Sequence, residues 1–318
     1  MKYGPDFGTR CIYNTRMMKA LKNGLTLIKR SARKYKKDDP VRLAGTTAYF
    51  TVFALAPIII IIVSVTGLLI GEEKIQEKVF TELSRLLGDQ GTQYIRDLVA
   101  NYHTTEKSII GTIVGFVVFI FTSTTFFKVM QNSLNFIWRI RVKPSSGFLK
   151  SIKDRLLSFG LILSLGFIML VSLLIDAAIS FFRDYLEELL PNLTVVIMEV
   201  GNYIVSLGIA MAIFAVIYRF LPDARIKWKI TWAGAFITAL LFTLGKLLIG
   251  LALGNSNIGI MYGAAGSLVL ILLWVFYSAI IFFFGAEITQ QYAEMHGHRI
   301  LPKDFAVEIE IKEIETNE

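Results

Sequence analysis

The feature that most restricts this chain is a series of six apolar stretches, each long enough to cross a lipid bilayer as a helix. They lie at 45–70, 108–130, 156–179, 195–220, 231–253 and 266–290. A helix needs about 20 apolar residues to cross a hydrocarbon layer about 30 Å thick. The third and sixth stretches are apolar on every face, as helices embedded in lipid are. The sequence therefore predicts an all-α, polytopic membrane protein built as a bundle of six transmembrane helices.

Composition supports a bilayer rather than one ordinary core as the place where this apolar excess is buried. Hydrophobic residues make up 54% and charged residues 18% of the 318 residues, and the mean hydropathy is +0.57. An average soluble domain carries about 25% charged residues. The single cysteine, Cys11, cannot form an internal disulfide and therefore says nothing about the redox compartment.

The distribution of Lys and Arg predicts the orientation, because these residues are retained on the cytoplasmic side of a membrane. They gather before the first stretch, between the second and third, between the fourth and fifth, and after the sixth. The segments 71–107, 180–194 and 254–265 carry few and are expected outside, with both termini in the cytoplasm. The net charge of +8 then indicates attraction to anionic lipid headgroups, and we expect no nucleic-acid binding.

The chain divides into three predicted parts. A basic cytoplasmic segment at 1–43 precedes the transmembrane domain at 44–291, whose external loop at 71–107 reads as short amphipathic helices, and an acidic cytoplasmic tail follows at 292–318. The alternating Ile and Glu residues of 305–318 favour a solvated, weakly ordered end to that tail.

The basic segment has the pattern of a helix that lies in the membrane interface. Met18, Leu21, Leu25 and Ile28 fall on one side at helical spacing, and lysines and arginines fall on the other. The dipeptide Asp39-Pro40 is expected to end this helix, because the residue before a proline resists helical geometry.

The candidate site consists of ionisable residues inside the apolar stretches, each of which costs about 2.5–3.5 kcal/mol at a helix centre. Two charged layers are predicted. Near the external face, Lys246 is the deepest charge, and Asp176 and Glu199 lie at similar depth; near the cytoplasmic face are Glu287, Lys128 and Arg219. Two interpretations stay open: paired groups that fix helix packing, or a vestibule that admits a charged or zwitterionic headgroup.

Pro57 predicts a helix break in the middle of the first stretch, since proline removes one backbone hydrogen bond. Such a break either shapes packing or lines a substrate route. Residues of catalytic type are sparse: His103, His296 and His298 lack the further ligands that a hydrolytic metal centre needs. We therefore expect no enzyme activity, no catalytic residue, no metal and no cofactor.

Four stretches, in order over about residues 40–290, resemble the YihY/BrkB family of bacterial inner-membrane proteins, also called the ribonuclease BN family. They are RLAGTTAYFTVFALAPIIII, QNSLNFIWRIR, YRFLPDARIKWKITWAGAFITALLFTLGKLLIG and MYGAAGSLVLILLWVFYSAIIFFFGAEIT. The family pattern falls on Tyr49, Pro57, Asn135, Trp138, Tyr218, Pro222, Trp228, Gly234, Ala235, Lys246, Tyr262, Gly263, Trp274, Gly285, Ala286 and Glu287. Through this resemblance Tyr49 and Asn135 join the candidates for a substrate pathway.

The resemblance implies a multi-pass protein of the bacterial inner membrane that acts as a transporter or flippase-like protein for a lipid or other amphiphile. The expected partners are membrane lipids, either an anionic phospholipid or a lipopolysaccharide precursor. A homo-oligomer and an envelope protein partner both stay open. The alternative is a membrane scaffold of an envelope assembly, acting through 71–107 and the acidic tail. The ribonuclease name looks like a misassignment, because the HxHxDH motif of genuine ribonucleases of that name is missing here.

Overall fold

The computed structural model describes residues 7–70, 109–144, 191–254 and 266–311, with short pieces at 76–77, 79–81, 83–84, 92–93, 96–97, 152, 156–157, 160–168, 171–172 and 175. The described residues are predominantly helical, which confirms the helical class. The long helices are α1 (Phe7–Lys37), α2 (Pro40–Ile70), α4 (Ile109–Ile137), α6 (Pro191–Phe220), α7 (Trp228–Gly254) and α9 (Gly266–Met295).

Three helices among the described residues are long and apolar enough to cross a membrane. They are Val200–Phe220 in α6, Trp228–Lys246 in α7 and Leu268–Met295 in α9. These coincide with the fourth, fifth and sixth predicted stretches. The helices α2 and α4 occupy the first and second stretches, but their crossing, like that of the third, stays a prediction.

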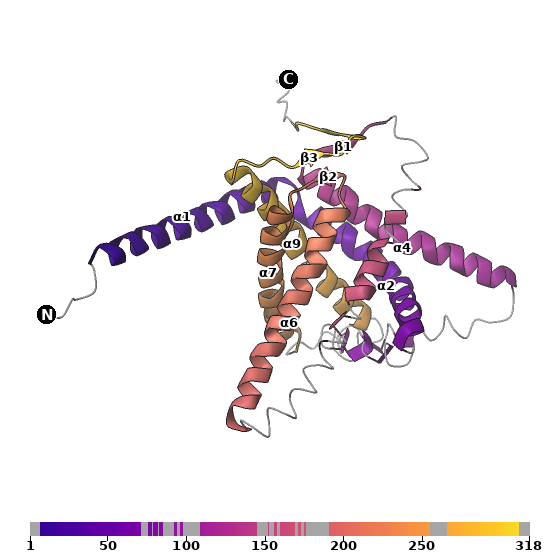
Figure 1. Cartoon of the computed structure of the whole chain (residues 1–318). Helices are drawn as coiled ribbons and strands as arrows, with labels where there is room; N and C mark the ends of the chain where they lie inside the picture. The colour runs from indigo at the N-terminus through magenta and orange to yellow at the C-terminus, as the bar shows by residue number, and fades with distance from the viewer. Residues whose placement is uncertain are drawn as a thin grey trace.

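Helix α9 lies at the centre of the packing. It contacts α7, α2 and α1, while α6 packs on α7 and α4 packs on α2 (Figure 1). The largest side chains with almost no exposed surface include Trp138, Tyr218, Phe127 and Phe283. The ring of Tyr218 stacks on that of Phe282 with the centroids 5.1 Å apart. Because aromatic side chains bury large apolar areas, this layer contributes strongly to holding α6 against α9.

The crossing of α7 and α9 is made close by glycine on each helix. A Cβ at Gly234 would collide with the side chain of Thr289, and a Cβ at Gly285 would collide with Thr238 and Tyr218. Each threonine therefore packs directly on a glycine backbone of the other helix. Small residues at a helix interface let backbones approach closely in membranes. The two glycine–threonine contacts also fix which residues of α7 and α9 lie at the same level.

The predicted end of the first helix at Asp39-Pro40 is confirmed. Helix α1 ends at Lys37, Asp39 has a left-handed φ of 52°, and α2 begins at Pro40. Asp tolerates this backbone conformation better than most residues, and proline suits the first position of a helix because its missing N–H is not needed there. Helix α2 continues through residue 57. The break expected at Pro57 therefore does not divide the helix.

Helix α1 packs on the rest of the protein with a different side from its predicted apolar side. Leu27, Ser31 and Tyr35 are buried, whereas Leu25 and Ile28 are 69% and 53% exposed. The side chains of Met18 and Leu21 lie outside the described residues. The N-terminal part of α1 projects away from the other helices (Figure 1). The exposed leucine and isoleucine thus stay available for a membrane interface.

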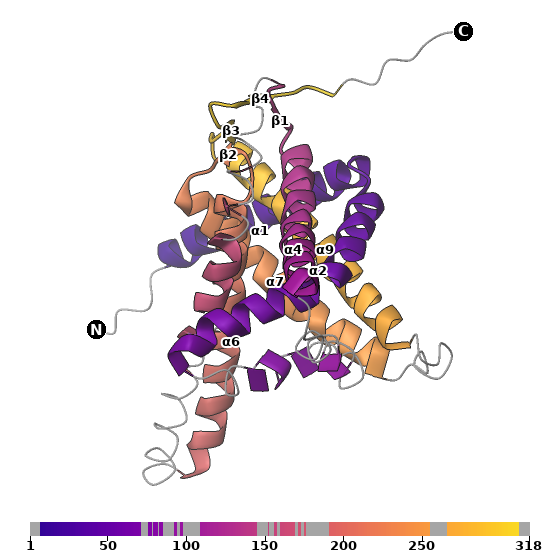
Figure 2. The same ribbon diagram turned by 90° about the vertical axis from the view of Figure 1, so that its right-hand side faces the viewer.

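Two small antiparallel sheets lie at one end of the helical bundle, which we call the strand end (Figure 2). Strand β1 (Ile140–Val142) pairs with β4 (Ala306–Glu308), and β2 (Ala224–Arg225) pairs with β3 (Leu301–Pro302). The protein is therefore not purely all-α, and the weakly ordered tail expected at 305–318 is wrong for 306–308. Its alternating apolar and acidic residues have the period of a strand, and β1 supplies the partner.

Candidate functional site

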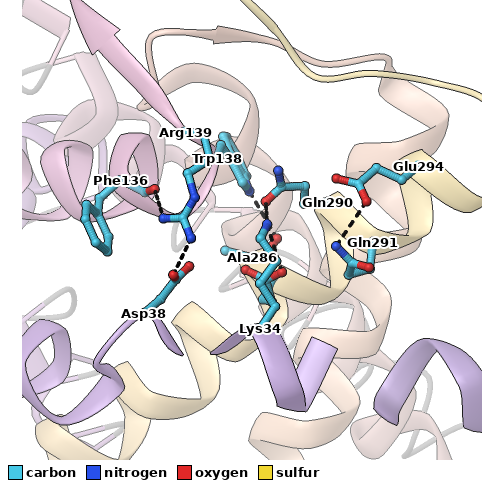
Figure 3. Close-up of polar contacts among 10 residues, drawn as sticks. Lys34, Asp38, Phe136, Trp138, Arg139, Ala286, Gln290, Gln291 and Glu294 are labelled. Carbon is cyan, nitrogen blue, oxygen red and sulfur yellow. Dashed lines mark hydrogen bonds and ion pairs between the residues drawn. The ribbon is translucent and has the colours of Figure 1, made fainter. Parts of the chain in front are cut away.

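The candidate site is a cluster of buried charges at the strand end, where α1 meets α9 (Figure 3). The Glu287 side chain on α9 is 0% exposed, and Lys34 on α1 is 25% exposed. The Lys34 Nζ lies 3.1 Å from Glu287 Oε1 and donates a hydrogen bond to Gln290 Oε1 at 2.6 Å. A candidate membrane-spanning helix thus carries a buried carboxylate whose cation comes from the peripheral helix α1.

A second buried ion pair lies beside the first. Arg139, in the turn after α4, donates from Nη2 to Asp38 Oδ1 at 2.5 Å and from Nη1 to the Phe136 carbonyl at 3.1 Å. Arg139 has a φ of 59°, a left-handed conformation uncommon for residues other than glycine. Its carbonyl accepts a hydrogen bond from Ile309 N at 2.8 Å. The pair with Asp38 and the contact with Ile309 hold this residue in its unusual conformation.

The cluster contains buried side-chain oxygens without hydrogen-bond partners among the described residues. Within the described part of the chain, the buried side-chain oxygens that lack a hydrogen-bond partner are Ser31 Oγ, Asp38 Oδ2 and both oxygens of Glu287. Ser31 and Lys34 share one side of α1, and Asp38, in the turn that follows it, continues that side, because residues three, four and seven apart lie together on a helix. Lys34 pairs with Glu287 through Oε1, and Glu287 Oε2 has no hydrogen-bond partner among the described residues. The site therefore has unused acceptor capacity around a negative charge.

Three aromatic side chains from three other parts of the chain donate to backbone carbonyls of α9. Trp138 Nε1 donates to Ala286 O at 3.1 Å, Tyr218 Oη to Phe282 O at 2.7 Å, and Tyr35 Oη to Ile280 O at 2.8 Å. Burial, with the nearby Glu287 charge, raises the pKa of Tyr35 above its usual value. The phenol therefore stays protonated and remains a donor. These bonds position the segment of α9 that carries Glu287.

Asn135 belongs to a neighbouring polar network rather than to the Glu287 cluster. Its Nδ2 donates to Asp223 Oδ2 at 2.8 Å, and its Oδ1 accepts from Asp223 N at 2.9 Å, while Gln131 Nε2 donates to Asp223 Oδ1 at 3.3 Å. This network joins the end of α4 to the turn after α6. Asn135 also lines an open groove of about 800 Å³ bounded by β1 and residues 309–311.

The α7–α9 crossing gives the depth of Glu287. Because Gly234 faces Thr289 and Gly285 faces Thr238, Glu287 lies level with Phe236. Trp228 and Trp232 are half-exposed and stack near the strand end of α7, with centroids 6.5 Å apart. Tryptophan is enriched where a bilayer meets water. At about 1.5 Å per residue, Glu287 lies about 6 Å inward of Trp232 and about 12 Å inward of Trp228.

The other predicted charges lie apart from this cluster. Lys246 is exposed at the opposite end of the candidate span in α7. Lys128 is exposed on α4, and the Arg219 guanidinium lies 5.2 Å from the Trp228 ring centroid. The side chains of Asp176 and Glu199 lie outside the described residues, so their predicted proximity to Lys246 stays a prediction.

Tyr49 is also exposed, and it contacts Phe53 with ring centroids 5.1 Å apart. Sequence reasoning missed Lys34 and Asp38, because it assigned the charges of the N-terminal segment to a solvated side. It also missed Arg139, which lies beyond the second apolar stretch. The available signal for α1 was the four-residue spacing of the buried residues Leu27, Ser31 and Tyr35.

Comparisons with known proteins agree with the resemblance seen in the sequence. The family model described as virulence factor BrkB matches residues 31–306. A UPF0761 membrane protein of Alteromonas mediterranea is 25% identical over 288 residues, which cover 86% of this chain and 92% of the relative. A UPF0761 membrane protein of Pseudoalteromonas translucida is 26% identical over 264 residues, which cover 79% of this chain and 81% of the relative.

A third relative, a UPF0761 membrane protein of Pseudomonas paraeruginosa, is 25% identical over 290 residues, which cover 90% of this chain and 68% of the relative. No solved structure matches the chain. The region matched by the family model includes Lys34, Asp38, Arg139 and Glu287, and therefore the whole charged cluster. The resemblance is thus confirmed: the chain belongs to the virulence factor BrkB family of membrane proteins.

Proposed function

We propose that this BrkB-family protein is a transporter or flippase-like protein that moves a lipid or other amphiphile across the bacterial inner membrane. The observation that carries the proposal is the Lys34–Glu287 pair, with its carboxylate 0% exposed and about one to two helical turns inward of the Trp228–Trp232 level. Ionisable residues at membrane depth are costly and commonly mark substrate or ion pathways.

A purely structural role explains this pair less well. Removing two charges from water costs several kcal/mol per ion, which is recovered only when geometry and additional hydrogen bonds are good. Here the Glu287 carboxylate has the contact of its Oε1 with Lys34, and its Oε2 has no hydrogen bond among the described residues. Hydrophobic side chains of similar size would pack α1 on α9 at lower cost. The arrangement therefore supports a place that receives a polar group.

The proposal includes six spans, both termini in the cytoplasm, and the strand end on the cytoplasmic side. Helix α1 and residues 301–311 both reach the strand end (Figure 2), which supports a common side for the two ends of the chain. The exposed basic residues of α1 and Lys143 lie there too, as expected for segments retained in the cytoplasm. They would attract anionic phospholipid or a lipopolysaccharide precursor.

Cysteine labelling tests this topology. Cys11 is first replaced by serine, and a cysteine is then placed at the exposed position Lys36 or at Glu77 in the predicted external loop. A membrane-impermeant maleimide added to intact cells with a permeable outer membrane is expected to label Glu77→Cys and not Lys36→Cys. Labelling of Lys36→Cys from outside would contradict the orientation.

A reconstitution assay tests the transport itself. Purified protein is placed in liposomes with a fluorescent phospholipid, and leaflet exchange is followed by quenching the outer leaflet. Wild type is expected to exchange faster than protein-free liposomes, and Glu287→Gln to lose this gain. Glu294→Gln is the matched control, because Glu294 lies two turns further along α9 and is exposed. Equal exchange with and without wild-type protein would refute the proposal.

Lys246→Ala tests whether Lys246, predicted near the external face, lines a substrate pathway or has only a structural role. Slower exchange is expected if Lys246 lines the pathway, and unchanged exchange is expected if its ammonium only reaches the water at the far interface. A scaffold function, by contrast, predicts that neither Glu287→Gln nor Lys246→Ala alters the activity measured in cells.

A further inference from the structure

We infer that the Lys34–Glu287 pair occupies the binding site of a zwitterionic lipid headgroup that carries a primary ammonium and a phosphate. This inference rests on the proposed function and names its substrate class. When the pair opens, Glu287 takes the ammonium of the guest, and Lys34 is released to take its phosphate. In the closed state Lys34 and Glu287 bind each other. After opening, Glu287 binds the positive charge of the guest and Lys34 binds its negative charge.

The first observation is a set of buried oxygens with unused acceptor capacity. Among the described residues, Ser31 Oγ, Asp38 Oδ2 and Glu287 Oε2 are buried without a hydrogen bond, and Glu287 Oε1 has the ion-pair contact with Lys34 at 3.1 Å. Carboxylates only accept hydrogen bonds, and a primary ammonium has three N–H donors. The Lys34 ammonium directs one of them to Gln290 and lies beside Glu287. A guest primary ammonium has the same three donors as the Lys34 ammonium and can replace it beside Glu287, whereas a quaternary ammonium has no N–H to offer.

The second observation is the different exposure of the two partners. Glu287 is 0% exposed, whereas Lys34 is 25% exposed and belongs to a helix at the edge of the bundle. Lys34 can therefore turn toward the surface without unfolding α9. Exposed cations beside it, including Arg30, Arg33 and Lys37, attract phosphate. The part of the site that would bind phosphate thus faces the protein surface, and the part that would bind the ammonium is buried at Glu287.

The third observation is the position in the bundle. The cluster lies about one to two turns inward of the half-exposed Trp228 and Trp232, so a headgroup enters it from the interface with a short displacement. A divalent metal fits less well, because the described residues contain no group of three His, Cys, Asp or Glu side chains that could hold one. The unused carboxylate oxygens of Asp38 and Glu287 favour an N–H cation.

Binding of soluble headgroups to detergent-purified full-length protein tests the inference. The probes are glycerophosphoethanolamine, glycerophosphocholine and glycerophosphoglycerol, and calorimetry measures the dissociation constants. The ethanolamine compound is expected to bind. The choline compound is expected to bind at least about ten-fold more weakly, because hydrogen bonds to charged acceptors are lost. The glycerol compound, which lacks the ammonium, is expected to bind as weakly as the choline compound.

The decisive variant is Lys34→Met combined with Glu287→Met, since replacing both members of a buried pair by apolar residues commonly preserves the fold. It is expected to lose the preference for ethanolamine, while Lys36→Met and Glu294→Gln, at exposed positions on the same two helices, retain it. Two results would overturn the inference: equal affinity of the wild type for all three probes, or an unchanged preference for the ethanolamine compound in a folded double variant. Water would then be the occupant of the site.

The two proposals fail separately. Suppose that the wild-type protein exchanges lipids with ethanolamine and choline headgroups equally fast and binds all three probes equally. This result overturns the headgroup inference but not the proposed transport. Preferential binding of the ethanolamine probe without any lipid exchange supports the headgroup site and refutes transport.

Discussion

Replacing Gly285 by alanine tests the close crossing of α7 and α9. The new Cβ would lie 2.7 Å from Tyr218 Oη and 2.8 Å from Thr238 Cβ, distances that real Cβ atoms essentially never show. Neither neighbour can move freely: Tyr218 Oη donates to Phe282 O at 2.7 Å, and Thr238 Oγ1 donates to Gly234 O at 2.8 Å. The methyl group can be accommodated only if α9 moves away from α7.

The magnitude follows from this lack of room. Overpacking a well-packed core costs about 1–3 kcal/mol, and two fixed neighbours place Gly285→Ala near the upper end. Alanine regains up to about 1 kcal/mol through its higher helix propensity, so the net loss is about 2 kcal/mol. Gly208→Ala on α6 is the control, because nothing lies within 4 Å of its Cβ. Only the propensity gain acts there, so the two substitutions should shift stability in opposite directions.

The free energy of unfolding, measured by denaturant titration in detergent micelles, distinguishes these outcomes. Adding Thr238→Gly to Gly285→Ala removes the threonine side chain from the collision and is expected to recover part of the loss, with the Tyr218 contact remaining. If Gly285→Ala is as stable as wild type, the two helices do not cross at this point, and the depth derived for Glu287 is wrong as well.

Three further results are expected. Asn135→Ala should lower the unfolding free energy by about 1–3 kcal/mol, because it leaves the buried Asp223 without two of its hydrogen bonds. Lipids brominated near the headgroup should quench the fluorescence of Trp228 and Trp232 more than lipids brominated at the chain end, and spare the buried Trp138. The raised pKa of Tyr35 stabilises the fold fully below the unfolded value of about 10, and this contribution is lost as the pH rises through the folded value. Tyr35→Phe should remove that alkaline loss in pH-dependent denaturant titrations.

The sequence predicts those parts of the fold that depend on local pattern. Long apolar stretches predict the helices α6, α7 and α9, and Asp39-Pro40 predicts the boundary between α1 and α2. Glu287 could be identified as a site residue because a single carboxylate in an apolar helix is costly wherever the helix packs.

Its partner could not be identified in the same way. Lys34 is one of many basic residues in a segment that looks amphipathic, and only the approach of α9 separates it from the exposed lysines beside it. The strand pair β1–β4 was missed for a similar reason. Each strand has three residues, and more than 150 residues of chain separate the two. Pairings of that kind are set by tertiary contacts and leave little local signal.

The exposed side of α7 favours Glu287 over Lys246 as the centre of the proposed site. Trp232, Phe236, Leu240, Leu244 and Leu248 are exposed at four-residue intervals along it, which gives this helix an apolar strip with tryptophan at the strand end. From Trp228 to Lys246 the helix rises about 27 Å, close to the thickness of a hydrocarbon layer, about 30 Å. A span of this length would place Lys246 at the opposite boundary, where an ammonium meets water at low cost. Glu287 has no such outlet, since its side chain is enclosed at the level of Phe236 and depends on a cation that α1 supplies. The proposed function therefore predicts that movement of Lys34 or of α1 opens the buried charge, whereas Lys246 needs no such step.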